Sequence, residues 1–192
     1  MKTLKEIFGY LLGGILFVCL IPSIMWLVSG RPDLFPSETL RLVIGAILAI
    51  DGLAISVWSI VYMRYKGNGN PMDAFGHEVA PRTKHLMTDG PYRLSRNPML
   101  TGTFVYLIGI CTWLWTWQAL AVFAIFVVIM LVQVRTEESR LRRDFGEEYE
   151  AYCRRTGRFF AVLIIRSLQS TLSDAGILPT NSTDRLRSAH LV

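Results

Sequence analysis

"LTGTFVYLIGICTWLWTWQALAVFAIFVVIMLVQV", Leu100 to Val134, is a run of 35 residues without a charged side chain. As a single helix it would be roughly 50 Å long at 1.5 Å per residue, which is too long for one crossing of a bilayer. We therefore expect two membrane spans folded back as a hairpin. The turn is predicted within "WLWTWQ", residues 113–118, because three tryptophans in five residues are typical of a membrane–water interface.

Two more apolar blocks precede this run. The first, Ile7 to Val28, is long enough to cross a bilayer, and Pro22 is expected to kink it. Its basic start resembles a signal peptide, but its length and the lack of a small-residue cleavage site favour a retained span. The second, Leu40 to Tyr62, holds Asp51 near its middle. An acid at that depth should face protein or water rather than lipid, either because it has a functional role or because it forms a hydrogen bond to a neighbouring helix. The sequence thus predicts an all-α, polytopic membrane protein with about four transmembrane helices.

The basic residues orient these spans. With four spans, most lysines and arginines fall on one side, and the opposite side has only Arg31 and Arg41. This asymmetry predicts that both termini and the loop 63–98 are cytoplasmic. The basic residues on that side are Lys2, Lys5, Arg64, Lys66, Arg82, Lys84, Arg93, Arg96 and those from Arg135 through Arg158.

Composition excludes several classes of protein. Hydrophobic residues make up 52% of the chain, above the usual globular value, and the charged residues lie between the apolar blocks. The net charge of +5 is better explained by anionic lipid head groups than by nucleic acid, because the basic residues flank those blocks. Three cysteines, two of them in apolar runs, indicate neither a disulfide framework nor a metal site.

The chain becomes rich in charge after the last span. "RTEESRLRRDFGEEYEAYCRRTGRFF", residues 135–160, predicts a cytoplasmic amphipathic helix that is broken near Gly146 or ends at Gly157. Residues 167–192 are predicted to form a polar, mobile tail. The apolar positions of the helix are Leu141, Phe145, Tyr149 and Tyr152.

The loop 63–98 is the first place to look for chemistry. Its Gly67-x-Gly69 follows a predicted transmembrane helix rather than a strand, so it indicates a flexible loop more than a nucleotide site. His77 and His85 lack the spacing and partners of a metal site, and none is predicted. In "RNPMLTG", residues 96–102, the Asn-Pro pair predicts a helix start. If the hairpin forms, this stretch and Glu137, just beyond the last span, should meet at one membrane face.

The chain resembles the isoprenylcysteine carboxyl methyltransferase family, which is grouped with the phospholipid methyltransferases. The resemblance is carried by "HLMTDGPYRLSRNPMLTG", the hairpin that follows it, and "RTEESRLRRDFGEEYEAYCRRTGRFF". The resemblance covers about residues 60–160. It implies an integral-membrane enzyme that uses S-adenosylmethionine and releases S-adenosylhomocysteine, with a methyltransferase core at 63–166 after two N-terminal transmembrane helices in 1–62. Its methyl acceptor would be lipid-like or a small hydrophobic molecule.

The resemblance also implies a cofactor site. The cofactor would be contacted by a four-residue stretch that lies two residues ahead of the Gly-x-Tyr and by that tyrosine. The family's His-Pro-x-Tyr positions and a glutamate would complete the site. A carboxylate suits this role because it accepts hydrogen bonds from a ribose hydroxyl or pairs with an amino group, and apolar side chains can border the adenine. By position these residues are Lys84, His85, Leu86, Met87, Tyr92, Asn97, Pro98, Met99, Leu100 and Glu137.

The chain departs from the family pattern at three positions. Asn97 stands for the histidine, Leu100 for the tyrosine, and Gln133 for an arginine that handles a substrate carboxylate. Arg135 is close in sequence to Gln133 but about 200° away around a helix. Gln133 and Arg135 are therefore the candidates to assist catalysis, and carboxyl, phospholipid amine and small-thiol acceptors remain open. A membrane binding module that retains the fold without catalysis is the contrasting hypothesis.

Overall fold

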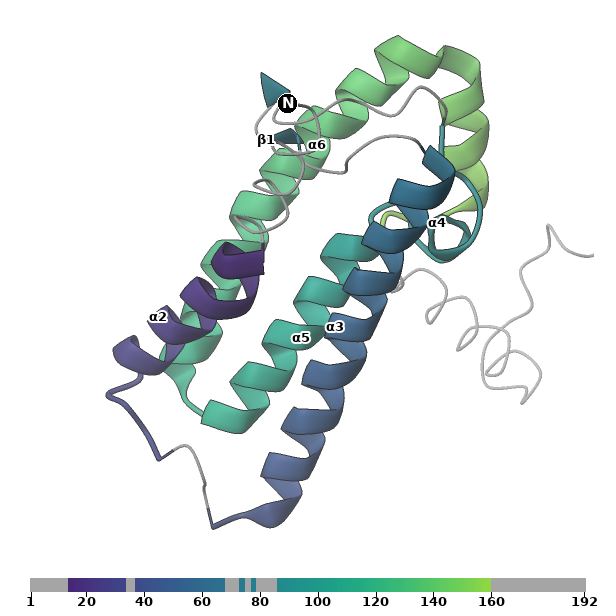
Figure 1. Cartoon of the computed structure of the whole chain (residues 1–192). Helices are drawn as coiled ribbons and strands as arrows, with labels where there is room; N and C mark the ends of the chain where they lie inside the picture. Colours follow the sequence, from purple (N-terminus) through teal and green to yellow (C-terminus); the bar gives the residue numbers. More distant parts are fainter. Residues whose placement is uncertain (1–13, 34–36, 68–72, 75–76, 79–85, 160–192) are drawn as a thin grey trace, which may run out of the picture.

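The computed structural model describes residues 14–33, 37–67, 73–74, 77–78 and 86–159 (Figure 1). This part of the chain is built from helices, as predicted, apart from two antiparallel strands of two residues each. In chain order the elements are the π-helix η1 Ile15–Leu20, α2 Ile21–Val28, α3 Thr39–Gly67, β1 Asp73–Ala74, β2 His77–Glu78, α4 Pro91–Leu94, α5 Pro98–Leu114 and α6 Trp117–Arg155.

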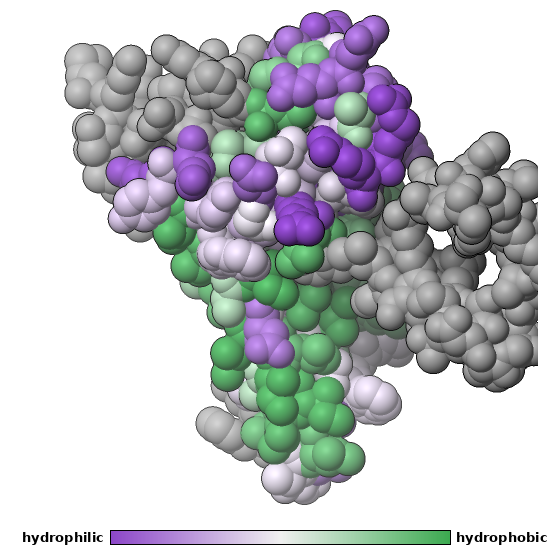
Figure 2. Space-filling view, turned by 90° about the vertical axis from the view of Figure 1, so that its right-hand side faces the viewer, coloured by the Kyte–Doolittle hydropathy of each residue, from purple (hydrophilic) through white to green (hydrophobic). Residues whose placement is uncertain are grey.

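Two helices, α3 and α6, are long and apolar enough to cross a membrane, and the helical stretches Ile15–Val28 and Pro98–Leu114 are apolar but shorter. Only 22% of the most apolar part of α3 and 17% of that of α6 is buried. Large apolar side chains therefore point outward, among them Ile50 at 65% and Val128 at 61% exposure. Figure 2 shows this apolar surface below a hydrophilic upper end. Such a surface suits association with lipid.

The helices α3 and α5 lie side by side at very short range (Figure 1). Gly45 on α3 faces Gly109 on α5, and Gly52 on α3 faces Gly102 on α5. The two glycines of each helix are seven residues apart. A Cβ atom on Gly102 would lie 2.6 Å from the carbonyl oxygen of Gly52. Gly102 thus permits the close approach of α3 to α5.

The hairpin expected from the sequence is present. Between α5 and α6, Trp115 adopts a left-handed conformation with φ 49°, and Thr116 caps α6 by accepting a hydrogen bond from the Ala119 amide at 3.3 Å. The turn therefore falls within the predicted stretch 113–118. The Ser29 and Thr116 hydroxyls are 2.6 Å apart and join the end of α2 to this turn.

Aromatic side chains connect the helices of the core. The ring of Phe104 on α5 lies 6.1 Å from Phe123 and 6.0 Å from Phe126, both on α6. Phe17 in η1 meets Phe126 at 5.8 Å, and the Tyr106 hydroxyl donates to the Val18 carbonyl at 2.9 Å. The first apolar block is thereby attached to the hairpin. Within it, the π-helix gives way to an α-helix at Ile21, next to Pro22, where the sequence predicts a kink.

The helix α6 continues without interruption from its apolar part into its charged part, and then breaks at Gly146. Gly146 has φ 50° and ψ −122°, a conformation that residues with a Cβ atom rarely adopt. After this break the helix turns back and descends beside α4 (Figure 1). It ends at Arg155, two residues before Gly157. The predicted break near Gly146 is confirmed.

Asp51 lies exposed on the surface of α3. Within the ranges that the structure describes, it makes no hydrogen bond to a neighbouring helix, which was one interpretation of the sequence. Several other predictions concern residues outside these ranges, namely the start of the first span before Gly14, Lys84 and His85 in the loop, and the tail 167–192.

Candidate functional site

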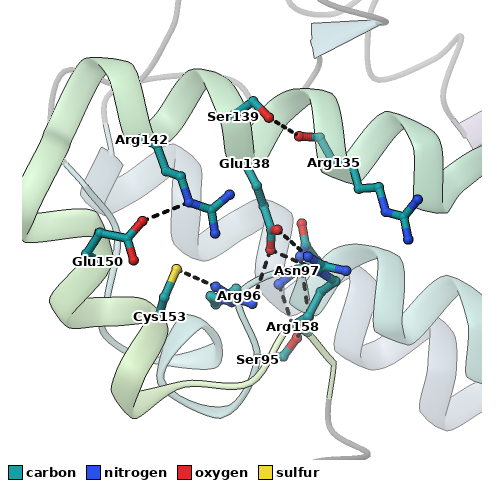
Figure 3. A network of polar contacts seen from close by, with 10 residues as sticks. All are labelled: Ser95, Arg96, Asn97, Arg135, Glu138, Ser139, Arg142, Glu150, Cys153 and Arg158. Carbon is teal, nitrogen blue, oxygen red and sulfur yellow. Dashed lines mark hydrogen bonds and ion pairs between the residues drawn. The ribbon is translucent and has the colours of Figure 1, made fainter.

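Four segments meet at the polar end of the hairpin. They are α4, the start of α5, the charged part of α6, and residues 156–159 that follow α6, here called the return segment (Figure 3). The return segment reaches back to α5, because the Arg96 amide donates to the Gly157 carbonyl at 2.9 Å. The stretch 96–102 and the charged part of α6 therefore meet through Arg96 and Glu138, which lie 3.2 Å apart (Figure 3). The glutamate named in the prediction was the adjacent Glu137.

The start of α5 is organised around the buried hydroxyl of Ser95. This hydroxyl accepts a hydrogen bond from the backbone amide of Asn97 at 3.1 Å, donates to the Arg158 carbonyl at 3.0 Å, and lies 3.1 Å from the Thr101 hydroxyl. Pro98, also buried, occupies the first turn, so the predicted helix start is confirmed. The Asn97 side chain does not cap α5. Its Nδ2 donates instead to the Arg158 carbonyl at 3.3 Å.

Glu138 is the centre of a buried ion cluster. Its side chain is 3% exposed, and both of its oxygens bind Arg158, with Nε at 3.1 Å and Nη2 at 2.6 Å. Arg96, 11% exposed, places Nη2 3.2 Å from the same carboxylate, and its Nη1 contacts the Cys153 sulfur. The hydrogen bond to Glu138 raises the pKa of the Arg158 guanidinium, so this group stays charged. Within this cluster, one carboxylate serves two guanidinium groups.

Glu137, the glutamate predicted to bind the cofactor, has a different environment. Its side chain is 31% exposed, and an oxygen lies 3.4 Å from the Arg140 guanidinium one turn further along α6. Neighbouring residues on a helix point about 100° apart, so only Glu138 faces the cluster with Arg96 and Arg158. Glu137 thus lies partly exposed at the surface of the site.

The other predicted cofactor contacts lie along α4 and the first turn of α5. Tyr92 is buried: its hydroxyl donates to the Met63 sulfur at 3.8 Å, and its carbonyl accepts from the Tyr152 hydroxyl at 2.6 Å. Leu86 and Met87 are half-buried ahead of α4. The Met99 carbonyl accepts from Ser56 of α3 at 3.0 Å, and Leu100 packs on the apolar core.

The two catalytic candidates lie on α6 just before Glu137. Gln133 is half-buried and Arg135 is exposed, and the Arg135 carbonyl accepts a hydrogen bond from Ser139 at 2.9 Å. Figure 3 shows the Arg135 side chain directed away from the Glu138 cluster. In the residues that the structure describes, no group of three potential metal ligands occurs.

Sequence reasoning did not single out Glu138, Arg96 or Arg158 as a cluster. The available signal was weak, because the acids of Glu137-Glu138 look equivalent in the sequence and Arg158 lies 20 residues beyond Glu138. The pairing depends on the reversal at Gly146, which brings the return segment back to α6.

Comparison with known proteins gives a family match over most of the described helices. The family model described as phospholipid methyltransferase matches residues 40–148, more than half of the chain. The match includes α3, α4, α5 and α6 up to just beyond its break. It ends before Cys153 and the return segment.

One curated relative is the nickel-cobalt-cadmium resistance protein NccN of Alcaligenes xylosoxydans xylosoxydans, with 30% identity over 105 residues. The aligned part is 54% of this chain and 49% of the relative, so the chain spans about half the length of the curated relative it matches. No solved structure matches the chain.

Proposed function

The chain belongs to the phospholipid methyltransferase family, and from this premise we propose that it transfers a methyl group from S-adenosylmethionine to a lipid-like or small hydrophobic acceptor at a membrane. The observation that carries the proposal is that Arg96, next to Asn97, lies 3.2 Å from the Glu138 carboxylate. This contact brings the start of α5 to the Glu137-Glu138 stretch of α6, where the apolar helices pass into the polar end. A site at that level is open to a polar cofactor from water and to an amphiphile from the bilayer.

The side chains here suit S-adenosylmethionine. Glu137, partly exposed, is an acceptor for a ribose hydroxyl or a partner for the amino group of the methionine moiety. Half-buried Leu86 and Met87 offer apolar surface for the adenine, and Asn97 offers an amide. Lys84 and His85, outside the described residues, complete the proposed set together with Tyr92, Pro98, Met99 and Leu100.

The cofactor supplies a methyl group already activated by a sulfonium. What remains for the protein is to hold donor and acceptor in line and to exclude water, which is the proximity contribution to catalysis. In our proposal, the α5 start and Glu137 fix the cofactor, while Gln133 and Arg135 on the preceding turn of α6 orient the acceptor. A carboxylate acceptor needs no base, whereas an amine or thiol must first lose a proton.

We further propose that the site and both chain termini lie on the cytoplasmic side, and that the acceptor enters sideways from the bilayer. The excess of basic residues near this end supports this orientation. Carboxyl, phospholipid amine and small-thiol acceptors all remain compatible with Gln133 at the position of the family's arginine.

Cofactor binding tests the proposal. Calorimetric titration of the purified protein with S-adenosylhomocysteine should give a saturable signal, and Glu137→Ala should weaken binding by at least about ten-fold, the effect of about 1.4 kcal/mol. Glu150→Ala is the matched control: it removes an exposed carboxylate of the same helix, paired with Arg142 at 2.8 Å, and should leave binding unchanged.

Absence of heat and of a thermal shift in the wild-type protein would refute the enzyme proposal. Equal affinity of the wild-type and Glu137→Ala proteins would show that binding does not use this glutamate. The non-catalytic hypothesis, a membrane module that retains the fold, predicts the first of these two results.

A further inference from the structure

The return segment, Thr156–Phe159, lies beyond the residues that the family model matches, yet it touches the start of α5 at several points. We propose that it is a clasp that positions Asn97 for cofactor binding, and that Arg158 and Glu138 are positioning residues that hold the clasp closed. The inference rests on the proposed function, because it assigns these residues a role in the same site.

Backbone and aromatic contacts fix the course of the segment. The Gly157 carbonyl accepts from the Arg96 amide at 2.9 Å, and the Phe159 ring lies 5.5 Å from the ring of Phe104 on α5. Thr156 is 7% exposed. These contacts place the Arg158 carbonyl beside the first residues of α5, where it accepts from both Ser95 and Asn97.

The contact with Asn97 decides which way its amide points. A carbonyl oxygen only accepts hydrogen bonds, so the amide atom that faces it must be the nitrogen. The Asn97 oxygen is therefore directed away from the Arg158 carbonyl as a hydrogen-bond acceptor. An amide at this position is useful for recognition only if one orientation prevails, and the return segment imposes that orientation.

The Arg158 side chain ties the same segment to α6. It binds both oxygens of Glu138, whose buried carboxylate also contacts Arg96, the residue directly before Asn97. Glu138 is thus attached to the residue before Asn97 and to the residue that orients Asn97 (Figure 3). A substitution of Arg158 would keep its backbone carbonyl but would remove the ion pair with Glu138 that holds this carbonyl in place.

A double-mutant cycle separates positioning from simple stabilisation. The S-adenosylhomocysteine dissociation constant is measured by calorimetry for the wild type, Arg158→Gln, Asn97→Ala and the double variant, together with the thermal midpoint of each. We expect Arg158→Gln to weaken binding by about ten-fold in the wild-type background and by less than about two-fold in the Asn97→Ala background, since its effect acts through Asn97.

Arg142→Gln is the matched control, because it removes the same charge from the exposed pair with Glu150 and should not change the affinity. Arg158→Lys keeps a charge near Glu138 but cannot bind it in the two-pronged manner of a guanidinium, and should give an intermediate affinity. If Arg158→Gln does not fold, the same cycle is run with Arg158→Lys.

Three results would overturn the clasp. One is a lower thermal midpoint of Arg158→Gln with unchanged affinity for S-adenosylhomocysteine, which indicates a purely structural role. Another is an equal loss of affinity in both backgrounds, which shows that Arg158 does not act through Asn97. The third, no binding by the wild type, removes the proposed function together with the clasp, and so is distinguishable from the first two.

Discussion

Glu138→Ala is expected to lower the free energy of unfolding by about 3 kcal/mol, the lower end of the range for removing one partner of a buried ion pair. The reason is that the cluster has a single carboxylate, 3% exposed, for two guanidinium groups. Arg96, 11% exposed, would keep its charge in a buried site without this partner. Arg158 is 34% exposed and can recover part of the loss from water, which is why we expect the lower end of the range.

Thermal unfolding in detergent provides the measurement, and Glu137→Ala is the control from the adjacent position. Glu137 is 31% exposed and stays in contact with water, so its removal should cost less stability than removal of the buried Glu138. Glu138→Ala should therefore have the lower thermal midpoint of the two variants. Equal thermal midpoints for the two would contradict the buried ion cluster.

Gly52→Ala is expected to separate α3 from α5 and to destabilise the protein by about 2 to 3 kcal/mol or more. A Cβ atom at this position would lie 2.2 Å from the Tyr106 amide nitrogen and 2.5 Å from the Gly102 carbonyl oxygen. Both are backbone atoms, so no change of side-chain rotamer can relieve the clash. The whole helix pair must move, and with it the Ser56 contact to Met99 at the start of α5.

Gly14→Ala serves as the control for this substitution. Gly14 also has a helical backbone, with φ −59°, but among the described residues no atom outside its own stretch of chain lies within 4 Å of an added Cβ. The thermal midpoint of the Gly14→Ala protein should match that of the wild type or exceed it slightly, because alanine favours a helix more than glycine does. A Gly52→Ala protein as stable as Gly14→Ala would refute the close packing of α3 and α5.

Much of the helical hairpin could be predicted from the sequence. The run Leu100–Val134 is uncharged and too long for one span, and the tryptophans at 113–117 indicated where it turns, which is where Trp115 leaves the helix. A helix was also predicted for the charged stretch that follows, and α6 continues unbroken into it, because a change of composition ends a membrane span without ending a helix. The number of spans and their orientation remain predictions.

The start of α5 was also predictable, since an Asn-Pro pair before an apolar run constrains the local backbone. The ion cluster was not. Which of the two adjacent glutamates is buried depends on the rotation of α6 about its axis, and this rotation is set by packing against the other helices. Arg96 and Arg158 lie far from Glu138 in sequence. Arg96 approaches it because α5 and α6 form a hairpin, and Arg158 because the chain reverses at Gly146, so no periodicity in the sequence relates them.

Transfer of a labelled methyl group tests the central claim most directly. The purified protein is incubated with radiolabelled S-adenosylmethionine and native lipid extract, and the label is followed into the extractable products, with Glu137→Ala as the matched negative control. The account predicts a labelled amphiphilic or small hydrophobic product with the wild type and at least about ten-fold less label with Glu137→Ala. Saturable S-adenosylhomocysteine binding without transfer of label to any component of the extract would contradict it.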